Sequence, residues 1–400
     1  MASASCAAGL REGGFDGELA LVGREADPPY SRPPASKGYL AGRESRDDAL
    51  FHPADWYAEH RVRLLTRTSV MKLDLAAREA RLSTKETLGF DQALVATGAN
   101  VRRLPVDGAD LEGLHYLRAL RNADALRDDV ADAERVVLVG GSYIASEVAA
   151  TLTVMGKRCT MVMQEDLPLS TAFGRTAGAA LADLLGAHGV ELVTGDEVAR
   201  LEGDDERVAR VVLASGRVLE AGAVVLGVGA VPDVMLARAA GLALGERGGV
   251  RCDDRLRTSA PGVYAAGDVC EYDSVLHDGP VRIEHWDVAV QHGRTVADNM
   301  LGADRPHTAV PYFWSDLADW AMLEYVGPAI DGWDEEVVRG TPGDGPWAVW
   351  YLRGGRVVAA LSVGGCVDLD HARRLLADRT PVGEHREALA DPATDLAAVG

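Results

Sequence analysis

A short apolar segment followed by two glycines is the clearest candidate for a nucleotide-binding turn. Residues 136–139 read VVLV, which predicts a buried parallel strand. Gly140 and Gly141 permit a tight turn, and helical periodicity follows them. A strand, a glycine turn and a helix place backbone N–H groups and a positive helix end beneath a pyrophosphate. Ser142 and Ala145 stand where the G-x-G-x-x-G pattern has its other glycines, so an ordinary βα turn remains the alternative.

An acid at the end of a strand of small residues is the second candidate. Residues 258–268 read TSAPGVYAAGD, so Asp268 follows the turn glycine Gly267 directly. A carboxylate delivered by a strand end suits hydrogen bonds to the ribityl hydroxyls of a flavin. The alternative interpretation is a surface turn with a solvated aspartate.

The five cysteines are scattered as Cys6, Cys159, Cys252, Cys270 and Cys366. None forms a C-x-x-C or C-x4-C pair, so the redox dithiol of a disulfide reductase is not predicted. No Cys/His cluster has zinc spacing, and we expect structural thiols and no metal site.

The elements that must position these residues alternate in type along the chain. Periodicity predicts helices at 2–13, 119–126, 144–155, 177–188, 288–300 and 369–377, and strands at 18–22, 90–98, 159–163, 191–194, 208–213, 224–227, 335–338, 348–352 and 357–363. The proline-rich segment 28–37 is neither a regular helix nor a central strand. This order predicts an α/β fold in which one nucleotide-binding domain is inserted into another, with a smaller α+β domain appended.

Size and charge limit the function classes. A chain of 400 residues exceeds one usual core, so two or three domains are expected. The net charge of −20 argues against general binding to nucleic acids or anionic membranes. Apolar stretches are too short to span a bilayer and no secretory signal opens the chain, so we expect a cytoplasmic protein.

Six ordered segments together resemble one family: residues 32–37, 96–99, 135–147, 258–268, 284–286 and 312–316. It is the FAD-dependent ferredoxin reductases of bacterial oxygenase systems, of the putidaredoxin and rubredoxin reductase type, close to apoptosis-inducing factor. The resemblance implies two Rossmann-like dinucleotide-binding domains plus a C-terminal α+β domain, with FAD and NAD(P)H as cofactors. It divides the chain into an FAD domain at 1–102 and 232–305, an NAD(P)H domain at 103–231 and a C-terminal reductase domain at 306–400.

Site residues are implied position by position. The resemblance implies FAD contacts at Glu25, Arg32, Lys37, Thr97, Gly98, Gly267, Asp268, Glu284, His285, Trp286 and Trp314, and nicotinamide-nucleotide contacts at Gly140, Gly141, Ser142, Tyr143, Ile144, Glu147, Glu165 and Gly229. Glu25 would hold the adenosine ribose, and a helix opening at Glu284 would point its positive end at the flavin. Without the family, Trp286 and Trp314 would be interpreted as core aromatics, and Arg32 as a solvated loop charge.

Lys37 and Glu147 are the implied catalytic pair. The family places this acid against this lysine, as an ion pair near flavin N5. A buried pair holds both groups charged and leaves the ammonium to stabilise negative charge on the flavin. The alternative for Glu147 is an exposed helix glutamate.

The beginning of the chain departs from the family. Residues 1–11 match the helix after the first FAD turn, so the strand before that turn and its glycines are absent. We expect a misassigned start codon, with a deletion product as the alternative. The 400-residue chain is then expected to retain FAD poorly.

The nicotinamide preference rests on the end of the second strand, where NAD-dependent relatives carry an acid on the ribose 2′-OH. Here the strand ends at Met163, Glu165 follows, and the next arginine is Arg175. The sequence therefore favours NADH over NADPH.

The expected function is electron transfer from NADH, through FAD, to a ferredoxin-type [2Fe-2S] protein, in a chain that binds neither nucleic acid nor membrane. Arg43 and Arg46 are candidate docking cations, and a homodimer is left open. The alternative is a non-catalytic NAD(H)/FAD-binding redox sensor or a truncated inactive homologue. An NADH oxidase or peroxide-reducing flavoenzyme is disfavoured because no cysteine lies in a suitable motif.

Overall fold

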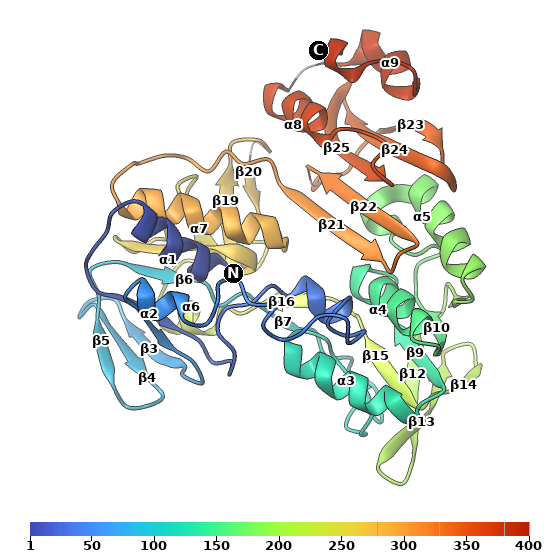
Figure 1. Cartoon of the computed structure of the whole chain (residues 1–400), viewed down its shortest axis with the longest axis horizontal. Helices are drawn as coiled ribbons and strands as arrows, with labels where there is room; N and C mark the ends of the chain where they lie inside the picture. The colour runs from blue at the N-terminus through green and yellow to red at the C-terminus, as the bar shows by residue number, and fades with distance from the viewer. Residues whose placement is uncertain (278, 328, 380, 400) are drawn as a thin grey trace. The chain divides into compact units, whose positions relative to one another are not determined.

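The computed structural model of the chain describes residues 1–277, 279–327, 329–379 and 381–399. The chain forms two compact units, each built from separated segments (Figure 1). Unit 1 contains residues 1–31, 47–100 and 231–312, and unit 2 contains residues 32–46, 101–230 and 313–400. The chain passes from one unit to the other after residues 31, 46, 100, 230 and 312, and the third and fourth of these points lie in the short strands β7 (Ala99–Val101) and β16 (Ala230–Pro232).

Unit 1 combines two long helices with short strands. Its elements are α1 (Ala2–Glu12), β1 (Leu19–Val22), α2 (Trp56–Glu59), β2 (Val62–Leu65), β3 (Val70–Asp74), β4 (Glu79–Leu82), β5 (Thr87–Gly89), β6 (Ala93–Val95), α6 (Met235–Ala239), β17 (Val250–Cys252), β18 (Val263–Ala265), η2 (Gly267–Val269), β19 (Cys270–Ser274), β20 (Gly279–Val281) and α7 (Trp286–Met300). In the described residues β1 pairs with β2, and β18 with β6, as two separate parallel pairs. The prediction about the first FAD strand and FAD retention is not tested by this arrangement.

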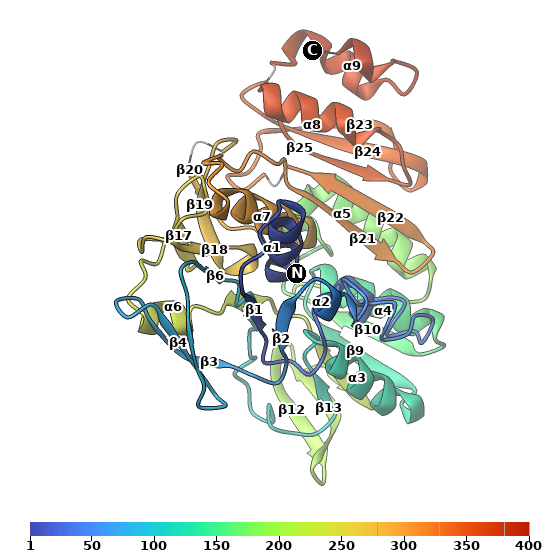
Figure 2. The ribbon, with the colours of Figure 1, turned by 60° about the vertical axis from the view of Figure 1, so that its left-hand side comes forward.

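Helices α1 and α7 lie side by side because small residues face each other at their crossing (Figures 1 and 2). A Cβ added to Gly293 would lie 2.3 Å from the carbonyl oxygen of Ala2, so only glycine allows this approach. The hydroxyl of Ser5 donates to the carbonyl oxygen of Val290 at 2.7 Å, which fixes the register of the two helices.

Unit 2 contains a parallel sheet with helices and a second, antiparallel sheet. Its first part has η1 (Pro33–Ser36), β8 (Leu114–His115), α3 (Leu120–Asp132), β9 (Arg135–Val139), α4 (Tyr143–Val154), β10 (Arg158–Val162), α5 (Ser170–Ala187), β11 (Glu191–Val193), β12 (Val198–Asp204), β13 (Arg207–Leu213), β14 (Val218–Glu220) and β15 (Ala223–Leu226). The sheet order β11–β10–β9–β15–β8 is parallel throughout, and the apolar strands β9 and β15 are buried at its centre. This is a doubly wound sheet whose direction of winding changes beside β9.

The second part of unit 2 is α+β. It contains β21 (Tyr312–Leu317), β22 (Ala321–Val326), β23 (Glu335–Thr341), β24 (Asp344–Arg353), β25 (Arg356–Val363), α8 (Leu369–Asp378), η3 (Gly383–His385), α9 (Arg386–Ala390) and η4 (Leu396–Ala398). The sheet has the order β21–β22–β25–β24–β23, and α8 packs on β25 (Figure 2). A core that includes Phe173 of α5 and Tyr351 of β24 packs helix and sheet together.

The predicted α/β architecture, with one Rossmann-like unit inserted between segments of another, is confirmed by the sheet order and by the order of the segments. The predicted domain limits stay a prediction, because the compact units group residues 32–46 and 313–400 with the inserted segment. No helix in the described part of the chain has the length and apolar character needed to cross a membrane.

Candidate functional site

The glycine turn after β9 adopts a backbone that only glycine tolerates. Gly140 has φ +120°, and a Cβ there would lie 2.4 Å from the carbonyl oxygen of Gly227. The N–H of Gly140 donates to the carbonyl oxygen of Val162 at 2.8 Å. The turn therefore lies at the carboxyl ends of β9, β10 and β15, where doubly wound sheets bind nucleotides.

Ala145 fits where the pattern has a glycine because the opposing residue is small. Ala145 is fully buried, and a Cβ added to Gly227 would lie 3.2 Å from the backbone nitrogen of Ala145. Gly227 thus allows α4 to lie close to the end of β15. Ser142, which stands at another glycine position of the pattern, is exposed at the N-cap of α4. Ile144, in the first turn of the helix, is half-buried.

Two further predicted nucleotide residues lie at the same edge of the sheet. Glu165 follows β10, and its Oε2 lies 2.9 Å from the position of a Cβ on Gly141. Gly229 follows β15 with φ +94°, and its carbonyl oxygen accepts the N–H of Arg102 at 2.9 Å. The carboxylate of Glu165 thus lies beside the glycine turn, and its contact with an adenosine ribose stays a prediction.

One face of α4 carries Tyr143, Glu147 and Thr151, which are spaced four residues apart. The ring of Tyr143 meets that of Phe313 edge-on, with centroids 4.6 Å apart. Burial raises the pKa of Tyr143, and Glu147 adds to the rise. The hydroxyl of Thr151 donates to the carbonyl oxygen of Ser36 at 2.8 Å. This face therefore contacts both the proline-rich loop and β21.

Glu147, in the middle of that face, accepts three donors from two other segments. Lys37 Nζ lies 2.6 Å from Oε1, and the side chains are 14% and 6% exposed. The Ser315 hydroxyl donates to Oε1 at 2.6 Å, and the Ser36 hydroxyl to Oε2 at 2.5 Å. The predicted ion pair is confirmed, and the exposed-glutamate alternative is wrong. Both serines were missed, although each lies in a segment that carried the resemblance.

Residues next to this cluster have distinct environments. Asp316 follows Ser315, and burial raises the pKa of its carboxyl, while Lys37 lowers it in part. Trp314 is half-buried and, by the alternation of a strand, faces the side of β21 opposite to Ser315. Arg32 donates to the carbonyl oxygen of Arg118 at 2.5 Å, so part of its guanidinium serves a backbone contact within unit 2.

In unit 1, the Gly267 turn lies against the first turns of α1 and α7. Gly267 has φ +74°, and a Cβ there would lie 3.5 Å from Cβ of Ala289 and 3.6 Å from Cβ of Ala2. Two positive helix ends therefore approach the turn that carries Asp268. This arrangement fits a dinucleotide, because the helix ends suit its diphosphate and the carboxylate suits its hydroxyls.

The segment before α7 differs in one respect from the prediction. The helix begins at Trp286 with His285 as its N-cap, so Glu284 precedes the helix and does not open it. Arg282 Nη1 contacts the Glu284 carboxylate at 2.5 Å and the carbonyl oxygen of Asp268 at 3.1 Å. Burial lowers the pKa of His285 to about 4, so its ring is neutral near pH 7. The helix cannot begin before Trp286, because the backbone of residue 285 is extended.

A buried histidine missed by the sequence supports the same turn. The N–H of Gly267 donates to Nδ1 of His292 at 3.2 Å, and the ring of His292 is fully buried. Desolvation lowers the pKa of His292 well below its usual value, and His307, whose ring centroid lies 4.6 Å away, lowers it further. Burial lowers the pKa of His307 to about 4. The role of His292 depends on Nδ1 accepting this hydrogen bond, and no pattern in the sequence indicates such a contact.

The residues predicted to contact the adenosine ribose and the phosphate region of FAD are fixed by local contacts in unit 1. The Tyr30 hydroxyl donates to the carboxylate of Glu25. The Thr97 hydroxyl donates to the carbonyl oxygen of Asp233 at 2.6 Å, and the N–H of Asp233 donates to the carbonyl oxygen of Gly98 at 2.8 Å. These bonds hold the loop after β1 and the turn after β6.

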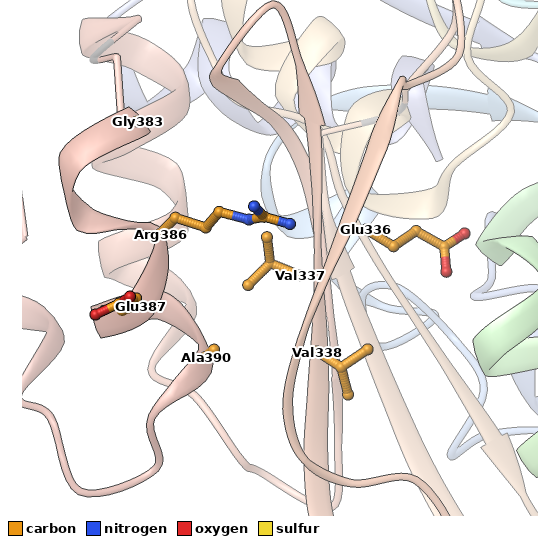
Figure 3. Close-up of a pocket in the computed structure, with 7 residues that line it drawn as sticks. All are labelled: Glu336, Val337, Val338, Gly383, Arg386, Glu387 and Ala390. Atoms are coloured by element: carbon orange, nitrogen blue, oxygen red, sulfur yellow. The ribbon is translucent and has the colours of Figure 1, made fainter.

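A hollow of about 520 Å³ lies elsewhere, between β23 and α9 (Figure 3). Figure 3 shows Arg386 reaching from α9 toward β23 above Val337, while Glu336 points to the other side of the strand. No predicted site residue lines it. In the described residues, no group of three or more His, Cys, Asp or Glu side chains could hold a metal ion.

Comparison with known proteins agrees with this geometry. The sequence profile described as pyridine nucleotide-disulphide oxidoreductase matches residues 1–293, and the profile described as reductase C-terminal matches residues 312–400. The chain belongs to the pyridine nucleotide-disulphide oxidoreductase family. It is therefore an oxidoreductase, and its cofactors are FAD and NAD(P)H.

The chain is similar to proteins named ferredoxin reductases over almost their whole length. The chain is 34% identical to the probable ferredoxin reductase CtmF of Castellaniella defragrans, over 100% of this chain and 96% of that protein. It is 32% identical to putidaredoxin reductase CamA of Pseudomonas putida, over 96% of this chain and 91% of that protein. A chain of the solved covalent putidaredoxin reductase–putidaredoxin complex superposes on this structure with a TM-score of 0.93. The sequence identity is 32%, and the match covers 99% of this chain and 95% of that chain. These likenesses support the catalytic interpretation rather than the sensor.

Proposed function

We propose that this chain carries electrons from NADH, through bound FAD, to a ferredoxin-type iron–sulfur protein. The observation that carries the proposal is the buried Lys37–Glu147 pair, whose glutamate lies on the helix that follows the glycine turn. Helix α4 begins at the proposed nucleotide-binding turn and, four residues after its first residue, carries the carboxylate that holds the Lys37 ammonium.

When bound, FAD would supply the acceptance of hydride and the release of single electrons, which no side chain of this chain supplies. The residues of this chain bind and orient the cofactor and the nucleotide, and they adjust the charge around them. Lys37 holds an ammonium where the flavin gains negative charge, and Glu147 keeps that ammonium in one position. Tyr143, one helical turn before Glu147, packs edge-on against Phe313, and this apolar contact on the same helix face favours a strong electrostatic effect of the pair.

The proposed FAD ligands are divided by the part of the cofactor that they contact. Glu25 holds the adenosine ribose, and Asp268 the ribityl chain or pyrophosphate. Thr97 and Gly98 shape the turn over the phosphates. The remaining proposed contacts are Arg32, Gly267, Glu284, His285, Trp286 and Trp314.

Glu165 supports a preference for NADH. Its carboxylate lies beside Gly141, where it can accept hydrogen bonds from a ribose 2′-OH and repel a 2′-phosphate. The proposed nicotinamide-nucleotide contacts are Gly140, Gly141, Ser142, Tyr143, Ile144, Glu165 and Gly229.

A ferredoxin partner is supported by the relatives, and we propose the [2Fe-2S] type. Arg43 is exposed and remains a candidate docking cation. Arg46 is a weaker candidate than the sequence indicated, because its guanidinium pairs with Asp124 and lies over the ring of Tyr39. A homodimer and a cytoplasmic location stay predictions.

Anaerobic titration with NADH of the purified chain, supplied beforehand with FAD because weak FAD retention is expected, tests the function. We expect a flavin absorption spectrum that bleaches with one NADH per FAD and recovers when oxidised ferredoxin is added. A protein that binds nucleotide without bleaching would favour the redox sensor. A protein that bleaches but reduces only dyes would contradict the ferredoxin assignment.

A further inference from the structure

The Ser315 hydroxyl ties the C-terminal sheet to the Lys37–Glu147 pair. It donates to Glu147 Oε1, the oxygen that also contacts Lys37 Nζ, and both distances are 2.6 Å. Ser315 is fully buried, so no water replaces its hydrogen bond. The segment that supplies it lies in the part of the chain matched by the separate C-terminal profile.

The position of Ser315 on β21 follows from its neighbours. Phe313 packs edge-on against Tyr143, and Leu317 is buried in the same apolar core. Residues two apart on a strand share a face, so Ser315 lies between two apolar anchors on the face that meets α4. A hydroxyl buried among apolar side chains is costly unless it has a partner, and Glu147 is that partner.

The remaining contacts show why the position of Glu147 depends on this bond. The Ser36 hydroxyl binds the other oxygen, Oε2, at 2.5 Å, and Thr151 fixes the carbonyl oxygen of Ser36. The carboxylate is therefore held at both oxygens, with the lysine sharing one of them. Loss of one hydroxyl leaves a buried carboxylate with fewer donors, so it turns or draws in water.

We propose that Ser315 is a positioning residue, which fixes the Glu147 carboxylate and, through it, the Lys37 ammonium. This rests on the function proposed above and extends it: the C-terminal sheet contributes to the electrostatics of the flavin-reducing site. Ser315 itself carries no proton in the reaction and contacts no substrate.

The test compares Ser315→Ala with a matched loss of a buried hydroxyl, Ser362→Ala. Ser362 lies on β25 of the same sheet, is equally buried, and its hydroxyl accepts the N–H of Val367 at 3.2 Å, away from Glu147. The readouts are the midpoint potential of the bound flavin, the limiting rate of its reduction by NADH, the KM for NADH and the thermal midpoint.

We expect Ser315→Ala to lower the potential and to slow flavin reduction about 10-fold, with KM for NADH changed less than about 2-fold. Ser362→Ala is expected to lower only the thermal midpoint. Ser315→Thr, which retains the hydroxyl, should restore the potential. In a Lys37→Met background, Ser315→Ala should slow reduction no further.

Ser315→Ala that behaves like Ser362→Ala, while Lys37→Met lowers the potential, would overturn this inference and leave the proposed function intact. Lys37→Met with the potential and rate of the parent would overturn the role of the pair itself, and with it that of Ser315. Additive effects of Ser315→Ala and Lys37→Met would show that Ser315 does not act through the pair.

Discussion

Lys37 Nζ lies 2.6 Å from Glu147 Oε1, although the two residues are separated by most of the first half of the sequence. Both side chains are nearly buried. An ion pair in such a place has a large desolvation cost, so it contributes to stability only while both partners and their hydrogen bonds are intact. The same fixed geometry is what a preorganised charge needs to assist a reaction.

Replacement of Lys37 by Met is expected to slow flavin reduction. The substitution removes the ammonium and leaves Glu147 without its cation, so the barrier should rise by at least about 1.4 kcal/mol, or about 10-fold in rate. Stopped-flow bleaching by NADH measures it. Lys72→Met is the control, because Lys72 is exposed on β3 and pairs with a neighbour on its own strand, Asp74. Equal rates for both variants would contradict the role of Lys37.

Glu147→Gln is expected to destabilise unit 2. Lys37 would keep its charge without a counter-charge in a nearly buried position, at a cost of about 3 kcal/mol. Urea unfolding followed by fluorescence measures the change. Glu220→Gln is the control, because the Arg135–Glu220 pair is exposed on both sides and its loss should cost at most about 1 kcal/mol. Similar costs would mean that Glu147 is not held as a buried ion.

Glu165→Ala is expected to weaken the binding of NADH and not that of NADPH. Loss of hydrogen bonds from a charged acceptor should raise KM for NADH about 10-fold, while removal of the carboxylate should improve the use of NADPH. Steady-state dye reduction with each nucleotide measures the ratio. Glu197→Ala is a nearby control, because Glu197 binds the Gln164 side chain and lies at no predicted contact. An unchanged ratio would remove Glu165 from the ribose site.

Unit 1 is expected to lose stability in mild acid. The pKa values of His285 and His307 are about 4 in the folded protein, and that of His292 is also lowered, whereas an unfolded histidine titrates near 6.5. Below about pH 6.5 the unfolded chain binds more protons, so stability is complete above that pH and falls by up to about 1.4 kcal/mol per pH unit for each histidine.

Thermal unfolding between pH 5 and pH 8 checks this prediction in the parent and in His292→Gln. Glutamine keeps an acceptor for the N–H of Gly267 but does not titrate, so the variant should show a shallower loss of stability in acid. An identical slope in the two proteins would show that His292 does not contribute to the pH dependence.

Ferredoxin reduction is expected to depend on salt more than dye reduction does. The net charge of −20 repels an acidic partner, so docking needs a local positive patch. Salt shortens the screening length from about 10 Å at 0.1 M to about 3 Å at 1 M, which weakens that attraction. Rates with ferredoxin and with a neutral dye, compared in the parent and in Arg43→Glu, measure the effect. Equal salt sensitivity in the two assays would exclude electrostatic docking.

Local patterns in the sequence predicted the regular elements that bury an apolar face. The expected helices at 2–13, 288–300 and 369–377 correspond to α1, α7 and α8. The strands β3, β12 and β21 were missed. Their residues alternate weakly, and the pairing that makes them strands comes from distant segments.

The sequence by itself determined the glycine turn, the family and the two members of the Lys37–Glu147 ion pair, because motifs of adjacent residues carry that information. Only the tertiary structure decided that Gly227 makes room for Ala145, that His292 holds the Gly267 turn and that Ser315 completes the surroundings of Glu147. Each of these contacts joins residues that are far apart in the chain. Their hydrogen bonds and close approaches exist only after the sheets and helices have packed, so no local pattern predicts them.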